Sequence, residues 1–132
     1  MTVLMIISPK NRPVFEAVIP ANSLSERQLI LSQLAIFAAL DMVDEAMWSS
    51  KDLYLKVVDR FNDQSVSAFV TPGNHRFMLL HDARQDDGLK AFFNKLYEFF
   101  IKIALNPFYD DEEPIRSKAF SDRVRHLAQE YL

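Results

Sequence analysis

Hydrophobic and polar positions along the chain change their period several times, and each change predicts a secondary-structure element. Residues 2–8, TVLMIIS, are a continuous β-branched and apolar run, which is typical of a buried strand. In residues 13–20 the side chains alternate, and the turn residues PKNR separate this second strand from the first. Three later runs also have strand-like alternation: 53–61, 65–71 and 75–82.

Helical spacing predicts three helices. The first has Ser25 as an N-cap and Gln28 three residues later, a capping-box pattern, and its periodicity continues to about Trp48. A second, Phe-rich helix covers residues 89–105, and the prolines of NPFYDDEEP end it. One row of this helix is expected to pack against the last helix: Tyr97, Ile101 and Leu105. The last helix carries its own apolar stripe: Phe120, Val124, Leu127 and Tyr131.

The predicted element order is β-β-α-β-β-β-α-α. Short connections between neighbouring strands predict a five-stranded antiparallel sheet, and the three helices must cover its faces. The length of 132 residues fits one compact domain. We therefore expect an α+β fold in which residues 1–132 form a single domain.

Composition narrows the classes of function. About half of the residues are apolar and a quarter are charged, which is ordinary globular composition. The net charge of −3 and the lack of a basic run give no indication of nucleic-acid binding. The chain has no cysteine, and it shows neither a signal peptide nor an apolar run long enough to span a bilayer. We expect a protein of the cytoplasm without direct membrane insertion.

The segment HDARQDDG, residues 81–88, suggests a metal-dependent phosphohydrolase that uses His81 and Asp82. However, His75 and His81 lie on one predicted strand about 20 Å apart, too far to bind the same ion. A structural interpretation is favoured: Asp82 caps the following helix together with Gln85, or Asp86 takes the N-cap position instead. The sequence contains no recognisable catalytic constellation either, so no catalytic residue, metal or cofactor is expected.

The first predicted helix is apolar on two sides. One side is expected to lie on the sheet: Leu29, Ile36, Phe37, Leu40, Val43 and Met47. On the other side a second row recurs at spacings of four, three and four, and two carboxylates flank it. This row is predicted to bind a partner: Leu31, Ala35, Ala38, Asp41, Met42 and Glu45. Scattered exposed apolar residues on a helix rich in alanine are the alternative explanation.

Several segments resemble the sedlin family, the small longin-fold subunits of TRAPP (trafficking protein particle) vesicle-tethering complexes. The resemblance runs from about Arg12 to the C-terminus and is most specific from Val66 to Phe93. These segments carry it: NRPVFEAVIP, FAALDMVDEAMW, YLKVVDRFND, VSAFVTPGNHRFMLLHDARQDDGLKAFF and NPFYDDEEPIRSKAF.

This resemblance implies a longin-like (SNARE-like) fold, with one helix on one sheet face and two on the other. It implies a non-enzymatic scaffold subunit in ER-to-Golgi and Golgi transport, peripheral at those membranes. Expected partners are a neighbouring palmitoylated core subunit and larger peripheral subunits, with a Rab GTPase engaged only through the whole complex. The resemblance also places Asp41 at a position associated with partner attachment. Another longin-type trafficking adaptor is the alternative function.

Overall fold

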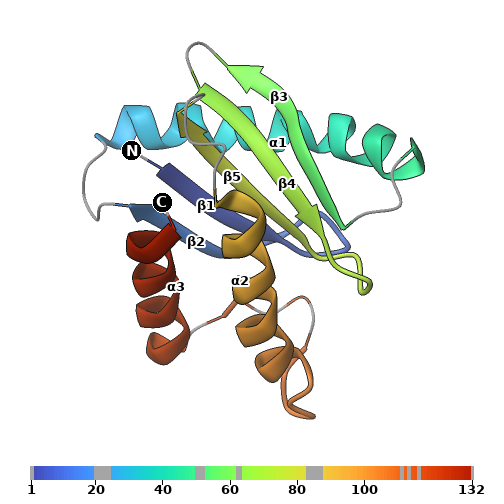
Figure 1. Ribbon diagram of the computed structural model, residues 1–132, viewed down its shortest axis with the longest axis vertical. Helices are drawn as coiled ribbons and strands as arrows, with labels where there is room; N and C mark the ends of the chain where they lie inside the picture. Colours follow the sequence, from blue (N-terminus) through green and yellow to red (C-terminus); the bar gives the residue numbers. More distant parts are fainter. Residues whose placement is uncertain are drawn as a thin grey trace.

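The computed structural model describes residues 2–19, 25–49, 53–61, 64–82, 88–110, 112, 114–115 and 117–131. Five strands and three helices follow one another in the predicted order (Figure 1). Their bounds are β1 Thr2–Ile7, β2 Pro13–Ile19, α1 Glu26–Ser49, β3 Tyr54–Phe61, β4 Gln64–Val70, β5 Arg76–Asp82, α2 Leu89–Ala104 and α3 Lys118–Tyr131. Each bound lies close to the one that the periodicity predicts.

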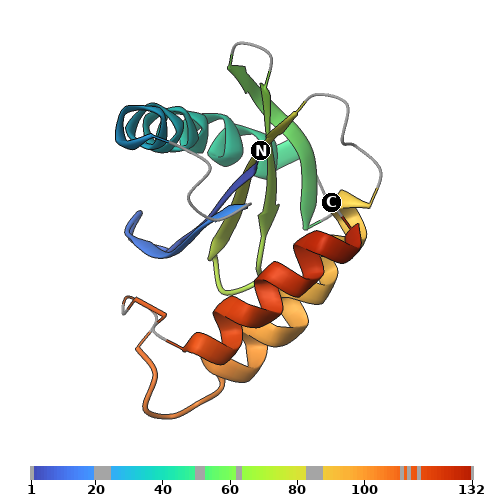
Figure 2. The same ribbon diagram turned by 90° about the vertical axis from the view of Figure 1, so that its left-hand side faces the viewer.

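The five strands form one antiparallel sheet in the order β2-β1-β5-β4-β3, as the hairpin pattern predicted. The middle of β1 shows the register, since Met5 pairs with Glu16 of β2 and with Met78 of β5. The first and last strands of this order are β2 and β3, which α1 connects in the chain. That helix therefore crosses the whole sheet from one edge to the other (Figures 1 and 2).

Each face of the sheet has its own core. On one face, α1 packs over residues that include Val3, Met5 and Met78. On the other face, α2 and α3 pack over the strand residues that alternate with these, including Leu4 and Ile6. Because successive side chains of a strand point to opposite faces, the continuous apolar run of β1 supplies both cores at once.

The two edge strands, β2 and β3, differ in what limits pairing at their outer edges. Strand β3 has two irregularities in its pairing with β4, and Lys56 has a positive φ of 64°. Along the outer edge of β2, the Val14 carbonyl accepts a hydrogen bond from the N–H of Ile115 at 2.6 Å. Nearby, the Val18 carbonyl accepts one from Arg125 Nη1 at 3.5 Å. Side chains and loop backbone thus occupy part of the β2 edge.

The corner between β5 and α2 departs from the prediction. Asp82 is the last residue of the strand, and the N-cap of α2 is Gly88, which makes no side-chain cap hydrogen bond. The predicted role of Asp82 as N-cap is therefore wrong, because too many residues separate it from the helix. Gln85 and Asp86 lie outside the described residues.

The contact between α2 and α3 also differs from expectation. Leu105 is 78% exposed and does not pack against α3. Tyr97 faces the sheet, where its ring centroid lies 5.7 Å from that of Phe69. Phe99 instead meets α3, with the Arg123 guanidinium 5.3 Å from the centre of its ring. The predicted row was wrong for Leu105, because α3 packs beside a different side of α2.

Candidate interaction surface

The buried histidines have structural partners in the described part of the chain. His81 is 1% exposed, and its Nε2 lies 2.7 Å from Ser67 Oγ on the neighbouring strand. His75 is 3% exposed and its ring centroid lies 4.8 Å from that of Phe100. No group of three or more potential metal ligands is present among the residues that the structure describes. The geometry of His81 therefore gives the phosphohydrolase hypothesis no support.

Helix α1 begins with the predicted capping box. The Gln28 N–H donates to Ser25 Oγ at 3.2 Å, and the Ser25 N–H donates to Gln28 Oε1 at 3.0 Å. These reciprocal bonds satisfy two N–H groups that a helix start would leave without partners. The first turn thereby fixes where the helix begins.

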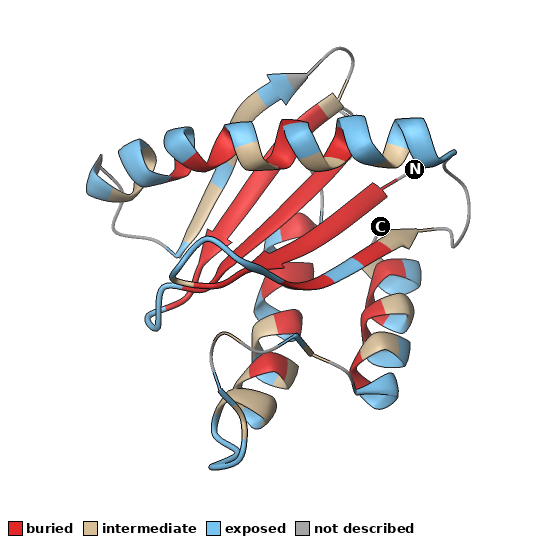
Figure 3. Cartoon of the chain, turned by 180° about the vertical axis from the view of Figure 1, so that it is seen from behind, coloured by how far each residue is buried: buried red, intermediate tan, exposed pale blue. Residues whose placement is uncertain are grey.

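The inner side of α1 is well packed. Ile36, Ala39 and Val43 are fully buried, and Leu40 is 7% exposed. They contact residues of β1, β4 and β5, which together form the core on this face. The side of α1 that was predicted to lie on the sheet is confirmed, and Figure 3 shows buried segments toward the strands and exposed segments outward.

The outer side of α1 carries large apolar side chains. Leu34 is 60% exposed, Leu31 is 46% exposed and Met42 is 47% exposed. We call this row the α1 apolar stripe: Ile30, Leu31, Leu34, Ala38 and Met42. From Leu31 to Met42 its members follow one another at spacings of three and four residues, and Ile30 lies four residues before Leu34, so all five lie along one side of the helix. A helix that packs only on its own sheet would be polar there.

The exposed row differs from the predicted partner-binding set in two places. Ala35 is only 8% exposed, so it does not belong to the outer surface. It stands one turn before the fully buried Ala39, at the border of the packed side, where a methyl group is easily covered by its neighbours. Leu34, the most exposed of the large side chains in the stripe, was not in the predicted set. Its spacing of three from Leu31 and four from Ala38 could have identified it.

Acidic residues flank the C-terminal half of the stripe. Asp41 and Glu45 are both exposed and lie four residues apart, on the same side of the helix. Neither has a cationic partner among the described residues. No basic residue occupies the last turn of α1, where the helix dipole favours positive charge. This arrangement of charges is unfavourable within the isolated chain and attracts basic groups from outside.

A third acidic residue, Asp44, has a different role. Its Oδ1 lies 3.4 Å from Nη1 of Arg76, whose side chain is 4% exposed. Nη2 of the same arginine donates to the carbonyl oxygens of Ser8 at 3.4 Å and Pro9 at 3.3 Å. Arg76, the first residue of β5, thus joins α1 to that strand and to the turn after β1. This contact fixes the helix on the sheet, and it does not involve Asp41 or Glu45.

Comparison with known proteins identifies the relatives of this chain. The family described as Sedlin matches residues 6–130. The "Transport protein particle 20 kDa subunit" of Schizosaccharomyces pombe is 43% identical over 130 residues, which is 96% of each chain. The "Probable trafficking protein particle complex subunit 2" of Caenorhabditis elegans is 41% identical, covering 96% of this chain and 93% of the relative. The protein of the same name from Drosophila melanogaster is 36% identical, covering 97% and 94%.

These matches agree with the architecture. The five-stranded antiparallel sheet with α1 on one face and α2 and α3 on the other is a longin-like α+β arrangement. Within the described ranges, the helices lack the length and apolarity that crossing a bilayer requires.

Proposed function

This chain belongs to the Sedlin family, and from that premise we propose that it is a non-enzymatic scaffold subunit of a TRAPP complex. It works as a single longin-like domain that presents surfaces to other subunits. Its place is cytoplasmic, peripheral at ER–Golgi and Golgi membranes, where it supports vesicle tethering and Rab nucleotide exchange by the whole complex. Its partners are a neighbouring palmitoylated core subunit and larger peripheral subunits, and it meets the Rab GTPase only through the complex.

The observation that carries this proposal is the α1 apolar stripe together with Asp41 and Glu45, whose carboxylates have no cationic partner in the part of the chain that the structure describes. Four of its side chains retain about half of their area in water, so covering them contributes roughly 1 kcal/mol each. The sum of about 4 kcal/mol corresponds to roughly a thousandfold in affinity, enough to make the stripe the centre of an interface.

The charges indicate what the occupant must carry. Asp41 and Glu45 repel each other across one helical turn, and the negative end of the helix dipole adds to this repulsion. A Lys or Arg placed between them relieves both effects. We therefore infer that the partner subunit presents apolar side chains to the stripe, with a basic side chain beside them.

Affinity capture from cytosol tests both parts of this proposal. The chain as bait should recover other TRAPP subunits, and Leu34→Glu, Ala38→Glu or Asp41→Lys should reduce the recovery of one of them at least tenfold. Asp122→Lys on α3 is a matched charge reversal at an exposed position and should leave recovery unchanged. Thermal unfolding of each variant checks that the domain still folds.

The two possible failures are distinct. Recovery of no TRAPP subunit by the unmodified chain would reject the scaffold function. Normal recovery by all three α1 variants would keep that function and show that the interface lies elsewhere.

A further inference from the structure

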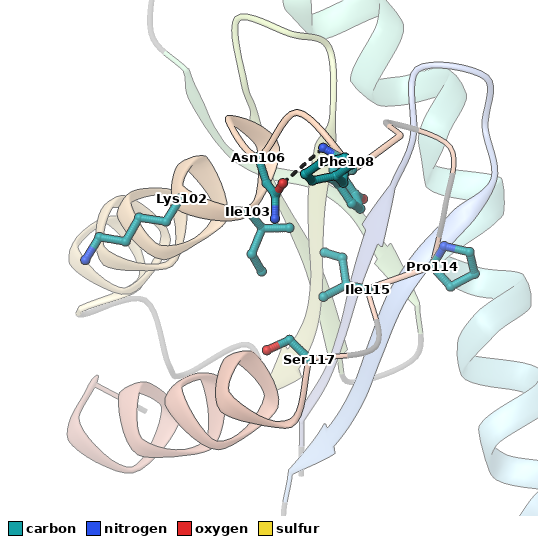
Figure 4. A pocket seen from close by; sticks show the side chains of 8 residues that line it. Lys102, Ile103, Asn106, Phe108, Pro114, Ile115 and Ser117 are labelled. Atoms are coloured by element: carbon teal, nitrogen blue, oxygen red, sulfur yellow. Dashed lines mark hydrogen bonds between the residues drawn. The ribbon is translucent and has the colours of Figure 1, made fainter.

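The segment Asn106–Tyr109, of sequence Asn-Pro-Phe-Tyr, forms a tight turn directly after α2. The N–H of Tyr109 donates to the backbone carbonyl of Asn106 at 3.0 Å. The N–H of Phe108 donates to Asn106 Oδ1, also at 3.0 Å (Figure 4). Asn106 therefore accepts both hydrogen bonds, and Pro107 restricts φ at the second position. The turn is held in one conformation before any partner arrives.

This turn presents an aromatic ring to solvent. Phe108 is 92% exposed, although Phe is among the residues most often buried. The ring belongs to the rim of a hollow of about 620 Å³, which Ile103 and Ile115 also line (Figure 4). An aromatic side chain fixed on a preformed turn loses little conformational freedom on binding, which is how anchor residues of interfaces work. With so little of its surface covered, the ring is not held in place by packing against the described part of the domain.

We propose that Asn106–Phe108 is a recognition turn for a small protein module that reads Asn-Pro-Phe. The module encloses the Phe108 ring in an apolar pocket and accepts a hydrogen bond from the Asn106 Nδ2 amino group, which the turn does not use. Four acidic residues follow at positions 110–113 of the sequence, so the rim of the module's pocket is basic. This surface lies beyond the end of α2, on the side of the sheet opposite α1 (Figure 2).

Two other binding partners for the same residues are disfavoured. A module that reads Asn-Pro-x-Tyr by pairing with an extended strand would need free backbone before Asn106, but α2 continues to Ala104. It would also need Tyr109, which is half-buried and lines the hollow. A second copy of the chain, inserting Phe108 into the same hollow, would bring two segments of four acidic residues together.

Titration of the full chain against a purified EH domain, a small helical module that binds Asn-Pro-Phe turns, tests the proposal. We expect saturable binding that weakens as the salt concentration rises, because the acidic segment contributes to it. Phe108→Ala should weaken binding at least tenfold. Leu105→Ala is the matched control, since that side chain is also apolar and 78% exposed but lies outside the turn. It should change the affinity by less than twofold.

A second substitution separates recognition from turn structure. Asn106→Asp keeps the oxygen that accepts the Phe108 N–H but removes the amino group, so it should preserve the fold and still weaken binding. Absence of saturable binding by the unmodified chain, or equal affinity of Phe108→Ala, would overturn the proposal. A concentration-dependent dimer that Phe108→Ala abolishes would overturn it in favour of a second copy. None of these results depends on the α1 apolar stripe.

Discussion

Replacing Gly88 with alanine should destabilise the domain, although only one methyl group is added. Gly88 has φ 85° and ψ −9°, a left-handed conformation, at the N-cap of α2. A Cβ built at this position would lie 2.9 Å from the carbonyl oxygen of Tyr131, in the last turn of α3. Gly88 therefore permits both the sharp entry into α2 and the close approach of α3.

The expected magnitude has three parts. Holding a non-glycine residue in the left-handed region costs about 1–2 kcal/mol. The methyl group also has to displace backbone at Tyr131, for which we take about another 1 kcal/mol, a typical overpacking penalty. Against these, alanine lowers the entropy of the unfolded chain, which stabilises the fold by about 0.4–1 kcal/mol. Gly88→Ala should thus lower the free energy of unfolding by about 1–3 kcal/mol.

Urea denaturation followed by circular dichroism measures this difference directly. For a domain of this size the same change corresponds to a decrease in Tm of roughly 3–10 °C. The only other glycine of the chain, Gly73, provides the control. A Cβ there would lie 3.9 Å from its nearest neighbour, Thr71 Oγ1, which is ordinary contact. Gly73→Ala should therefore leave stability unchanged or raise it slightly.

Gly88→Asn separates the two causes, because asparagine tolerates the left-handed region but has the same Cβ. If strain in φ dominates, this variant should recover most of the stability that alanine loses. If Gly88→Ala were within about 0.5 kcal/mol of the unmodified protein, as surface substitutions usually are, the reasoning would be refuted. It would mean that the two helices are not held together as closely as the structure shows.

Four further substitutions, in two pairs, test contacts that position α1. Arg76→Ala removes a buried cation that bonds two carbonyl groups and Asp44, and it should lower the free energy of unfolding by about 2–3 kcal/mol. Asp44→Asn should lower it by less than about 1 kcal/mol in the same urea titrations, because that carboxylate is 59% exposed. Ser25→Ala removes one half of the capping box and should lower it by about 1 kcal/mol, whereas Ser25→Asp should retain most of the stability.

Helices and strands whose buried residues follow one regular hydrophobic pattern could be predicted from the sequence. The order of strands and helices, the start of α1 at Ser25 and its packed side all follow from short-range signals, namely periodicity and capping. The antiparallel sheet follows from the short connections between strands. In each case the local sequence pattern and the packing of the folded domain favour the same structure, so tertiary contacts did not change the element that the pattern predicts.

Positions whose environment depends on distant elements could not be predicted in the same way. The N-cap of α2 is Gly88 because α3 comes within contact distance there, a fact that no local pattern near Asp82 contains. Ala35 is buried because of its place at the border of the packed side, which a helical wheel resolves only coarsely. Leu34 was within reach of the sequence, since its spacing from Leu31 fits the same row.

The different structures of the two sheet edges affect how well the protein resists aggregation at high concentration. An exposed strand edge invites pairing with the edge of another molecule, which is how sheets grow into aggregates. On β3, the two irregularities and Lys56 bend the edge and give it a charge. On β2, Ile115 and Arg125 already occupy the carbonyl groups of Val14 and Val18. Because both edge strands are protected in this way, two copies of the protein are hindered from pairing through their backbones. Association then depends on side-chain surfaces, which are selective for their partners.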